Sequence, residues 1–293
     1  MKVTYPRERQ LLVEEALEKF LPRQENYPDI IYRAMRHSLL SGGKRFRPIL
    51  ALASGEVFNQ GIQEVMPTAC AIEYIHTYSL IHDDLPAIDD DRLRRGKPTC
   101  HVLFGEDVAI LAGDALFAEA FYLVASAQRT DPPSKIIQVI EELASASGIR
   151  GMVKGQVADI FAAGKEIDAS TLDFIHSHKT GRLITAAARV GGILGDASEM
   201  ELETLTQYAH HLGLAFQITD DILDVVGEEA KMGKTVRKDE QRLKATFPAV
   251  FGVDKARELA KESVDKAKNI LKSLNRDVLT LKKLADFVYL RES

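Results

Sequence analysis

Apolar residues recur at helical spacing along nearly the whole chain of 293 residues, and this limits the fold more than any other feature. Leu12, Ala16 and Phe20, for example, fall on one helix face. No segment keeps the apolar and polar alternation of a half-buried strand, and no Gly/Ser-rich linker or fixed-period repeat divides the chain. We therefore predict an all-α fold in a single domain, residues 1–293. Further helices are expected at 49–57, 65–84, 108–127, 136–153, 172–190, 202–226, 255–271 and 278–290.

Short polar segments mark the expected helix boundaries. Ser170-Thr-Leu-Asp173 and Ser198-Glu-Met-Glu201 each place an acceptor side chain three residues before an acid. That pattern satisfies free backbone amides at a helix start. The segments 131–134 and 195–198 predict breaks between helices.

The composition excludes several classes of protein. The net charge is mildly acidic, at -5, and no long basic run is present, so no nucleic-acid partner is expected. Cys70 and Cys100 cannot build a disulfide framework, which favours a reducing cytoplasm. No apolar stretch follows the charged residues 1–9, so no signal peptide is predicted. The best apolar candidate, 183–194, contains Arg189 and is shorter than the roughly 18 residues of a membrane span.

Two clusters of acidic residues interrupt segments that are otherwise apolar. The first lies at the end of a predicted helix and contains Asp83, Asp84 and Asp89. Members of the second recur at i, i+3, i+4 and i+7 and therefore share one helix face. This second cluster consists of Gln217, Asp220, Asp221 and Asp224.

Carboxylates at these spacings repel one another unless a cation lies between them. Hard cations take oxygen ligands, and Mg²⁺ commonly shares its shell with substrate phosphates. A solvated acidic patch would explain one such cluster, but it explains two separate clusters poorly. Neither cluster has the 12-residue loop with a central glycine that a helix–loop–helix Ca²⁺ site needs. The two clusters therefore predict Mg²⁺ binding.

Basic residues flank both acidic clusters. Arginine forks and lysine ammonium groups suit phosphate oxygens, and glycines let backbone amides approach an anion closely. A lone Gly-Gly-Lys is more often a turn, but its combination with two acidic clusters suits one or two diphosphate groups. No G-x-x-x-x-G-K-[ST] loop and no G-x-S-x-G elbow is present. The basic residues are Lys44 and Arg47 before the first cluster, Arg94 and Arg95 after it, and Lys179 and Lys234 near the second.

Two histidines lie on the predicted helix that ends in the first cluster. His76 precedes Asp83 by seven residues, so it lies two turns back on roughly the same face. We predict that His76 binds ligand rather than serving only the fold. For His82, an Asp-orienting or structural role is the better interpretation.

In their order along the chain, these residues resemble the trans-prenyl diphosphate synthase family, and within it the bacterial farnesyl diphosphate synthases. The resemblance runs from about residue 32 to the C-terminus. It implies a single bundle of long helices around a deep central cavity, the isoprenoid synthase fold, and a homodimer. The motifs are Gly42-Gly-Lys-Arg-Phe-Arg-Pro48, His76, Asp83-Asp-x4-Asp89, Arg94-Arg95, Gly155-Gln156, Lys179-Thr180, Gln217-x2-Asp220-Asp-x2-Asp224 and Gly233-Lys234.

The resemblance also implies a role for each matched residue. Thr180 and Gln217 would turn their oxygens toward the allylic carbon. Three Mg²⁺ ions are implied, with Mn²⁺ as an alternative: two held by Asp83, Asp84 and Asp89, and one by Asp220 with Asp221 and Asp224. Arg94, Lys179 and Lys234 would hold the allylic diphosphate, and Lys44, Arg47, His76 and Arg95 would hold isopentenyl diphosphate. The implied catalytic set is Asp83, Asp84, Asp89, Lys179, Thr180, Gln217 and Asp220.

The implied reaction joins isopentenyl diphosphate to dimethylallyl diphosphate and then to geranyl diphosphate, and it yields (E,E)-farnesyl diphosphate and pyrophosphate. The allylic C–O bond breaks, while divalent cations and basic side chains neutralise the charge on the leaving pyrophosphate. The double bond of isopentenyl diphosphate attacks the allylic cation, and pyrophosphate is the expected proton acceptor. Water has to be excluded because it would quench the cation.

The residues just before Asp83 are expected to limit product length. Tyr78 and Ser79 lie five and four residues before it, and the resemblance implies that their side chains point down the cavity into which the chain grows. The resemblance implies that an aromatic ring at position 78 acts as a floor, as in bacterial farnesyl synthases, with a four-residue gap at 85–88 inside the first cluster. Simple core packing is the competing interpretation of Tyr78.

Other functions remain open at this point. A product of ten or twenty carbons would need the same chemistry. A terpene cyclase usually has an Asn/Asp–Ser/Thr–Glu motif in place of Asp220-Asp221-x-x-Asp224, and a non-catalytic regulatory subunit tends to lose such aspartates. The sequence departs from many relatives at Arg237 and Lys238, which are interpreted as surface charge or as part of a mobile cover.

Overall fold

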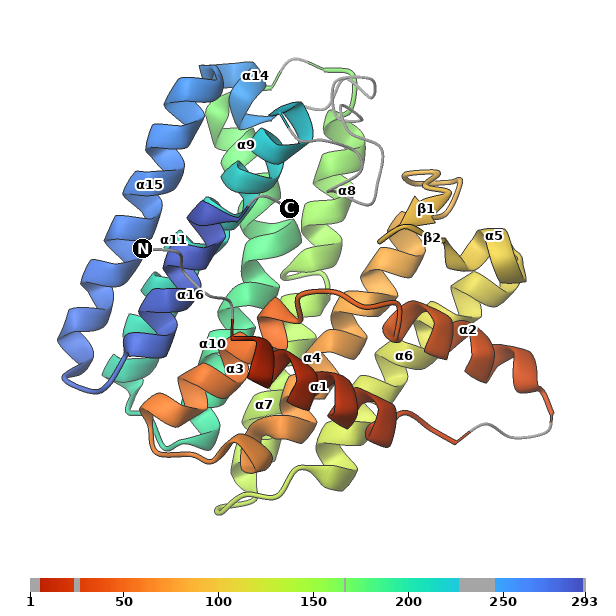
Figure 1. Ribbon diagram of the computed structural model, residues 1–293, viewed down its shortest axis with the longest axis horizontal. Coiled ribbons are helices and arrows are strands. Elements are labelled where there is room, and N and C mark those ends of the chain that lie inside the picture. Colours follow the sequence, from red (N-terminus) through yellow and green to blue (C-terminus); the bar gives the residue numbers. More distant parts are fainter. Residues whose placement is uncertain (1–5, 24–26, 166, 227–245, 292–293) are drawn as a thin grey trace.

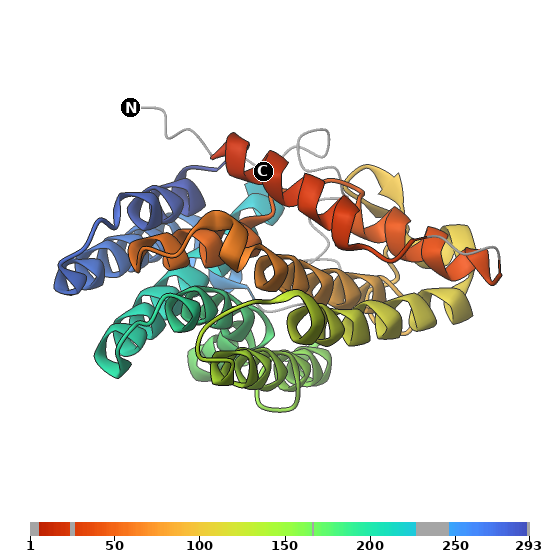
Figure 2. The same cartoon turned by 90° about the horizontal axis from the view of Figure 1, so that it is seen from below.

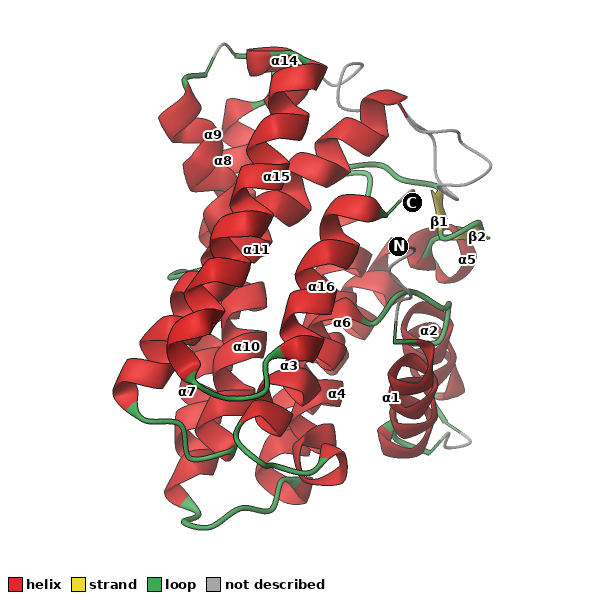
Figure 3. Ribbon diagram, turned by 60° about the vertical axis from the view of Figure 1, so that its left-hand side comes forward, coloured by secondary structure: helices red, strands yellow, loops and turns green. Residues whose placement is uncertain are grey.

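Helices form almost every element of the structure, as the apolar spacing predicts. The computed structural model describes residues 6–23, 27–165, 167–226 and 246–291. Within these ranges the only strands are β1 (Leu93–Arg94) and β2 (Lys97–Pro98), a short antiparallel pair beside α5 that the sequence did not predict (Figure 3). The first helices are α1 (Arg7–Phe20), α2 (Asp29–Leu39), α3 (Phe46–Val57), α4 (Ile62–Asp83), α5 (Cys100–Phe104), α6 (Glu106–Ala127) and α7 (Ser134–Ser147). The later ones are α8 (Met152–Ala162), α9 (Ala169–His176), the π-helix η1 (Ser177–Gly181), α10 (Arg182–Leu194), α11 (Glu199–Val226), α14 (Phe247–Phe251), α15 (Val253–Ile270), the 3₁₀-helix η2 (Leu271–Leu274) and α16 (Leu279–Leu290).

The helices pack in layers around α4 (Figure 1). Seen from below, α1 and α2 lie on one side of α4, while α6 and α7 lie on the other (Figure 2). Helices α10 and α11 extend the bundle from α3 toward α15. Tyr74, Ile72 and Ile75 on α4 are fully buried, and each large apolar side chain that is buried stabilises the fold by about 1.5–3 kcal/mol. The core therefore lies along α4, and the end of this helix carries the first acidic cluster.

Close crossings between helices depend on a few glycines. A Cβ atom on Gly191 of α10 would lie 2.3 Å from the carbonyl oxygen of Ala51 on α3. A Cβ atom on Gly155 of α8 would lie 2.1 Å from the backbone nitrogen of Lys179. Any larger side chain would force these backbones apart, so Gly155 fixes the distance between α8 and the segment that carries Lys179.

Several predicted helix boundaries need correction. The predicted helix 172–190 is three elements, because η1 inserts a π-helical turn between α9 and α10. The predicted helix 136–153 is broken between α7 and α8. Ser170 was expected to cap α9, but Asp168 does so, accepting a hydrogen bond from the Thr171 backbone nitrogen at 2.8 Å. The Ser198–Glu201 pair is confirmed as a cap at the start of α11, with Glu201 accepting from the Ser198 backbone nitrogen at 2.8 Å.

Among the described residues, one helix is long and apolar enough to cross a membrane. This is α6, and not the stretch 183–194, which the sequence shows to be too short for a span. A core helix passes the same test of length and composition, and α6 packs along α4. The helix also contains Asp114 and Glu119.

Candidate active site

A cavity of about 800 Å³ opens at the end of α4 that carries the first acidic cluster. Its walls come from the start of α3, from α4, α8, η1 and α11, and from Arg291 after α16. It brings together most of the site residues that the sequence predicted: Lys44, Arg47, His76, Tyr78, Ser79, Asp83, Arg94, Arg95, Lys179, Thr180, Gln217 and Asp220. Asp84, Asp89, Asp221 and Asp224 do not line it. Lys234, with Gly233, Arg237 and Lys238, lies outside the described residues.

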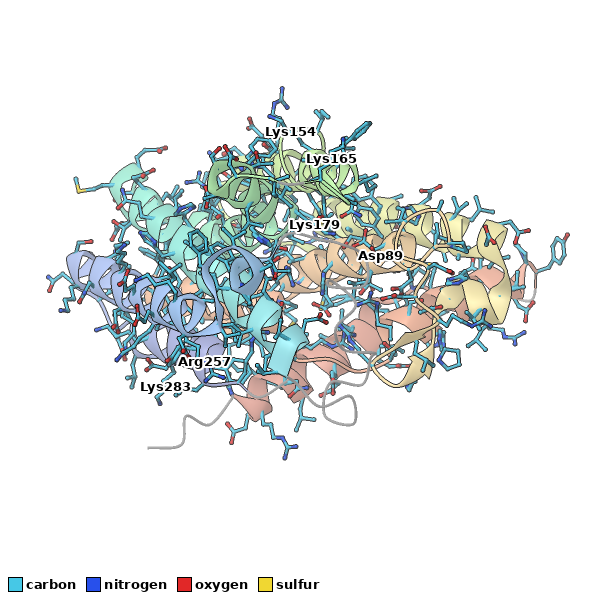
Figure 4. The ribbon with its side chains drawn as sticks, turned by 90° about the horizontal axis from the view of Figure 1, so that it is seen from above. Asp89, Lys154, Lys165, Lys179, Arg257 and Lys283 are labelled. Atoms are coloured by element: carbon cyan, nitrogen blue, oxygen red, sulfur yellow. The ribbon has the colours of Figure 1, made fainter. Side chains whose placement is uncertain are left out.

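Asp83 ends α4 and faces the cavity. Loss of water around it raises the pKa of this carboxyl to about 6; Lys179 opposes the shift, and the neighbouring charge of Asp89 adds to it. The loop after α4 folds back, and the backbone nitrogen of Asp89 donates to the carbonyl of Asp83 at 2.8 Å. In the view from above, Asp89 and Lys179 lie near each other over this end of α4 (Figure 4). A cation placed here would relieve the repulsion between the carboxylates.

Asp84 turns away from the central cavity and binds Arg94. The Nε of Arg94 donates to Asp84 Oδ1 at 2.8 Å, and its Nη2 donates to the same oxygen at 2.6 Å. The Asp84 side chain is only 5% exposed, and burial raises its pKa even though Arg94 opposes the shift. Arg94 therefore lines the cavity while it neutralises a buried acid.

The second acidic cluster presents one carboxylate to the cavity. Asp220 is 40% exposed and pairs with Arg291 at 2.8 Å. Asp221 instead accepts a hydrogen bond from the Phe247 backbone nitrogen at 3.0 Å, and Asp224 is buried. The three aspartates were expected to face one metal ion. In this structure they do not, because Asp221 points toward the start of α14 and binds its backbone.

The glycine-rich segment before α3 places two cations in the cavity wall. Gly42 and Gly43 have φ values of +90° and +131°, which favour glycine, and the Arg95 guanidinium lies against Gly43. Burial lowers the pKa of Lys44 to about 8, and the charge of Arg291 contributes. Burial also lowers the pKa of Arg47 to about 10. With several cations close together, this wall attracts anions.

His76 lies behind these cations, with its Nε2 3.5 Å from Nη1 of Arg47. Burial first, and then the charges of Arg47 and Arg95, hold the pKa of His76 well below its usual value. A neutral imidazole beside a cavity can donate one hydrogen bond without adding charge. His82 also lines the cavity, but it lies over Gly113 of α6 with its Nε2 3.1 Å from the carbonyl of Ile110, a contact that fits the structural interpretation.

The opposite wall is built on η1. The π-helical turn places Lys179 and Thr180 in the cavity wall, and π-turns of this kind occur frequently at functional sites. Lys179 Nζ donates to Asp159 Oδ2 of α8 at 2.7 Å. On α11, Gln217 Oε1 lies 3.2 Å from Nδ1 of His176. Both predicted polar groups are thus held in place by neighbours that the sequence did not single out.

Tyr78 lines the cavity one helical turn before Asp83, and further aromatic side chains pack behind it. The Tyr78 ring packs edge-on against Phe117 of α6 at 4.7 Å between centroids. Phe117 in turn packs against Phe121 at 5.1 Å. Burial raises the pKa of the Tyr78 hydroxyl to about 12. The Ser79 hydroxyl donates to the His76 carbonyl at 2.9 Å, so it is turned toward its own helix.

Sequence reasoning missed Arg291 and Arg45. Arg291 Nη2 donates to the Phe216 carbonyl at 2.8 Å, and the guanidinium lies 3.9 Å from the Phe216 ring. Arg45 is buried, with φ +54°, and its Nη1 donates to Glu73 at 2.7 Å. Arg45 lies inside the 42–48 motif and could have been noticed there. No local pattern marks a single arginine near the C-terminus, so only the packing of α16 reveals Arg291.

The carboxylates fit a divalent cation that is shared with substrate. Among the residues that the structure describes, no three His, Cys, Asp or Glu side chains converge closely enough to hold a metal ion by themselves. Mg²⁺ is usually bound through one or two carboxylates together with substrate phosphates and water. Asp83 and Asp220 are oxygen donors that line the same cavity as the basic groups, so the donor set fits such a shared ion.

Comparison with known proteins agrees with this geometry. The polyprenyl synthetase family matches residues 28–287. The chain belongs to the polyprenyl synthetase family. The geranylgeranyl diphosphate synthase of Cyanophora paradoxa is 45% identical over 292 residues, covering 99% of this chain and 97% of that protein. The farnesyl diphosphate synthase of Escherichia coli (strain K12) is 46% identical over 282 residues, covering 94% of each.

A solved structure supports the fold. The crystal structure of a geranyltransferase from Helicobacter pylori, complexed with magnesium and isoprenyl diphosphate, aligns with a TM-score of 0.84 and 32% identity. The alignment covers 96% of this chain and 94% of that one. Membership of this family and the helical architecture confirm the predicted all-α isoprenoid synthase fold.

Proposed function

We propose that this protein is a trans-prenyltransferase that condenses isopentenyl diphosphate with dimethylallyl and geranyl diphosphate to (E,E)-farnesyl diphosphate and pyrophosphate. Prenyl transfer follows from membership of the family and from relatives with this activity in their names. The fifteen-carbon product is the finer part of the proposal. One observation carries it: the Tyr78 ring lines the cavity and is backed by Phe117.

The two walls of the cavity would bind the two substrates. Arg94 and Lys179 lie near Asp83, so they would hold the allylic diphosphate, with Lys234 as a further predicted ligand. Lys44, Arg47 and Arg95 would hold isopentenyl diphosphate, and neutral His76 would donate a hydrogen bond to it. This arrangement brings the double bond of one substrate toward the allylic carbon of the other.

The remaining residues would act on the reacting carbons. The oxygens of Thr180 and of Gln217, the latter held by His176, would stabilise the allylic cation. Apolar walls that include Ile88, Val157 and Phe216 would exclude water from it. Mg²⁺ bound with the diphosphate would neutralise the charge that develops on the leaving pyrophosphate. We propose three such ions, held by the predicted sets Asp83, Asp84, Asp89 and Asp220, Asp221, Asp224.

A twenty-carbon product is the second candidate. Geranylgeranyl and farnesyl diphosphate synthases are similar to this chain at 45% and 46% identity, which favours neither length. Chromatography of the prenyl chain made from dimethylallyl and isopentenyl diphosphates decides between them. A dominant fifteen-carbon product supports the proposal, and a dominant twenty-carbon product overturns it.

Replacing Tyr78 tests the proposed floor. Tyr78→Ala removes the ring and should lengthen the product by at least one five-carbon unit, because the space above Phe117 opens. Tyr78→Phe keeps the ring and serves as the matched control, with no change in length expected. If the active Tyr78→Ala enzyme makes the wild-type product, Tyr78 is core packing and not the floor.

We also propose that the chain forms one domain and works as a cytoplasmic homodimer. Residues from Gly43 to Arg291 line the same cavity, which supports one domain. Cys70 and Cys100 are both free, as expected in a reducing compartment. Leu111 and Tyr122 of α6 and Ile137 of α7 are more than half exposed, and such apolar faces favour association. Sedimentation equilibrium of the full chain tests the dimer.

A further inference from the structure

A second cavity, of about 480 Å³, lies between α9, η1, α10 and α11. It shares no lining residue with the central cavity. Its volume falls within the range of small-ligand sites in proteins. The π-helix η1 nevertheless belongs to both, because Ser177 and Gly181 line the second cavity while Lys179 and Thr180 line the first.

Most side chains that line the second cavity carry a polar group, and Arg182 is the one permanent cation among them. Arg182 lies at its rim, is exposed and makes no ion pair that the structure records among the described residues. The rings of His210 and His211 lie 5.3 Å apart and both line the cavity. Among the lining residues, Asp173 is the one acid, and Leu214 is the one side chain larger than glycine that is apolar.

His211 has hydrogen-bonding capacity that the protein does not use. Its Nδ1 is buried and has no hydrogen-bond partner among the described residues. Burial, His210 and the nearby Lys266 all lower the pKa of His211, so its ring is mainly neutral. The charge of Lys266 adds to that of Arg182 in attracting an anion to this place.

We propose that the second cavity binds a small, polar phosphate monoester and that its occupancy is coupled to the central cavity through η1. Arg182 supplies a guanidinium fork for the phosphate oxygens, and the histidine rings supply N–H donors. Thr185 and Thr206 line the cavity and offer hydroxyl oxygens to the polar remainder of the ester. Because these hydroxyl groups would contact the polar remainder, we expect the cavity to bind the ester more tightly than inorganic phosphate.

The coupling follows from the geometry of η1. Gly181 lies against Gly213 of α11 so closely that a Cβ atom on Gly213 would be 3.2 Å from the Gly181 Cα. The backbone of η1 is therefore packed against α11 and carries side chains of both cavities. A return from the π-helical to the α-helical register would rotate Lys179 relative to Arg182. A ligand that holds Arg182 stabilises the present register, in which Lys179 pairs with Asp159.

Binding is tested on the full chain without prenyl substrates. Glycerol 3-phosphate is titrated and followed by ³¹P NMR, with inorganic phosphate as the comparison. We expect the ester to bind saturably to the wild-type protein. The Arg182→Ala substitution should weaken this binding about tenfold, because a charge-assisted contact is lost. Arg257→Ala removes an exposed arginine from α15 and should leave the affinity unchanged (Figure 4).

Three outcomes of this titration would overturn the proposal. If the Arg182→Ala variant bound glycerol 3-phosphate as tightly as the wild-type protein does, Arg182 would not be part of the site. Loss of binding in Lys44→Ala, which lies in the central cavity and outside η1, would place the ester in the central cavity instead. Equal affinity for glycerol 3-phosphate and inorganic phosphate would reduce the site to one for the free anion. Because none of these measurements uses prenyl transfer, they stand even if the proposed function fails.

The coupling rests on the proposed function and is tested by steady-state rates. Glycerol 3-phosphate should lower the KM for the allylic diphosphate in the wild-type enzyme and leave kcat unchanged. Arg182→Ala should keep the basal rate and lose this response. By linkage, inorganic pyrophosphate bound in the central cavity should tighten glycerol 3-phosphate binding, and glycerol 3-phosphate should tighten pyrophosphate binding by the same factor. A KM that does not respond at saturating ester would show that the two cavities are independent.

Discussion

The two acidic clusters serve the same cavity, but they are held in place in different ways. The first is fixed by its own loop, where the Asp91 backbone nitrogen donates to the carbonyl of Asp84 at 3.1 Å. The second lies on a regular helix, and its orientation depends on Arg291 and Phe247, which come much later in the chain. A side-chain orientation that is set by residues within the motif can be predicted from that motif. An orientation that is set by residues far away in the sequence cannot.

Removal of one carboxylate from each cluster is the most severe test of this comparison. We expect Asp83→Asn and Asp220→Asn each to lower turnover by about a thousandfold or more, because each removes an anion that positions the proposed cation. Pyrophosphate release measures the rate, and circular dichroism checks the fold. Asp254→Asn, on the exposed start of α15, is the control. A near-normal rate in either cavity variant would refute a shared role for the two clusters.

Removing the arginine that pairs with each cluster should lower the free energy of unfolding by a different amount for the two clusters. Arg94→Ala leaves Asp84 buried and unpaired and should cost about 3 kcal/mol of unfolding free energy. Arg291→Ala leaves Asp220 in contact with water and should cost only about 1 kcal/mol. Urea denaturation of both variants measures the difference. Equal losses would mean that both clusters depend on their arginine to the same degree.

The charge of Asp83 itself should destabilise the fold. Its pKa is about 6 in the folded protein and about 4 when unfolded, so the folded state binds the proton more tightly. The stability contributed by protonated Asp83 is full below pH 4 and is lost as pH rises through 6. Asp83→Asn should therefore raise the unfolding free energy at pH 8 by about 2 kcal/mol, with little gain at pH 4. A gain that does not depend on pH would contradict this cause.

The sequence was sufficient for the architecture and for most of the cavity wall. Helical spacing predicts the long elements, and the charged motifs predict Asp83, Lys179 and Asp220 as neighbours. The π-turn η1 was missed because a single extra residue leaves the apolar pattern of 172–190 nearly unchanged. The short pair β1 and β2 was missed because two residues are too few to show alternation. The turning of Asp221 toward α14 depends on tertiary packing that no local pattern records.

The smallest expected effect concerns the cationic wall that faces the clusters. Lys44 has a pKa of about 8, so it loses its charge as pH rises through that value. Because the neutral amine attracts phosphate weakly, kcat/KM for isopentenyl diphosphate should fall up to about tenfold between pH 8 and 9. Lys44→Arg stays charged throughout this range, so its profile should remain flat while Asp83 and the other groups are unchanged. An alkaline fall that persists in Lys44→Arg would assign the titration to another group and leave Lys44 without a role in binding this substrate.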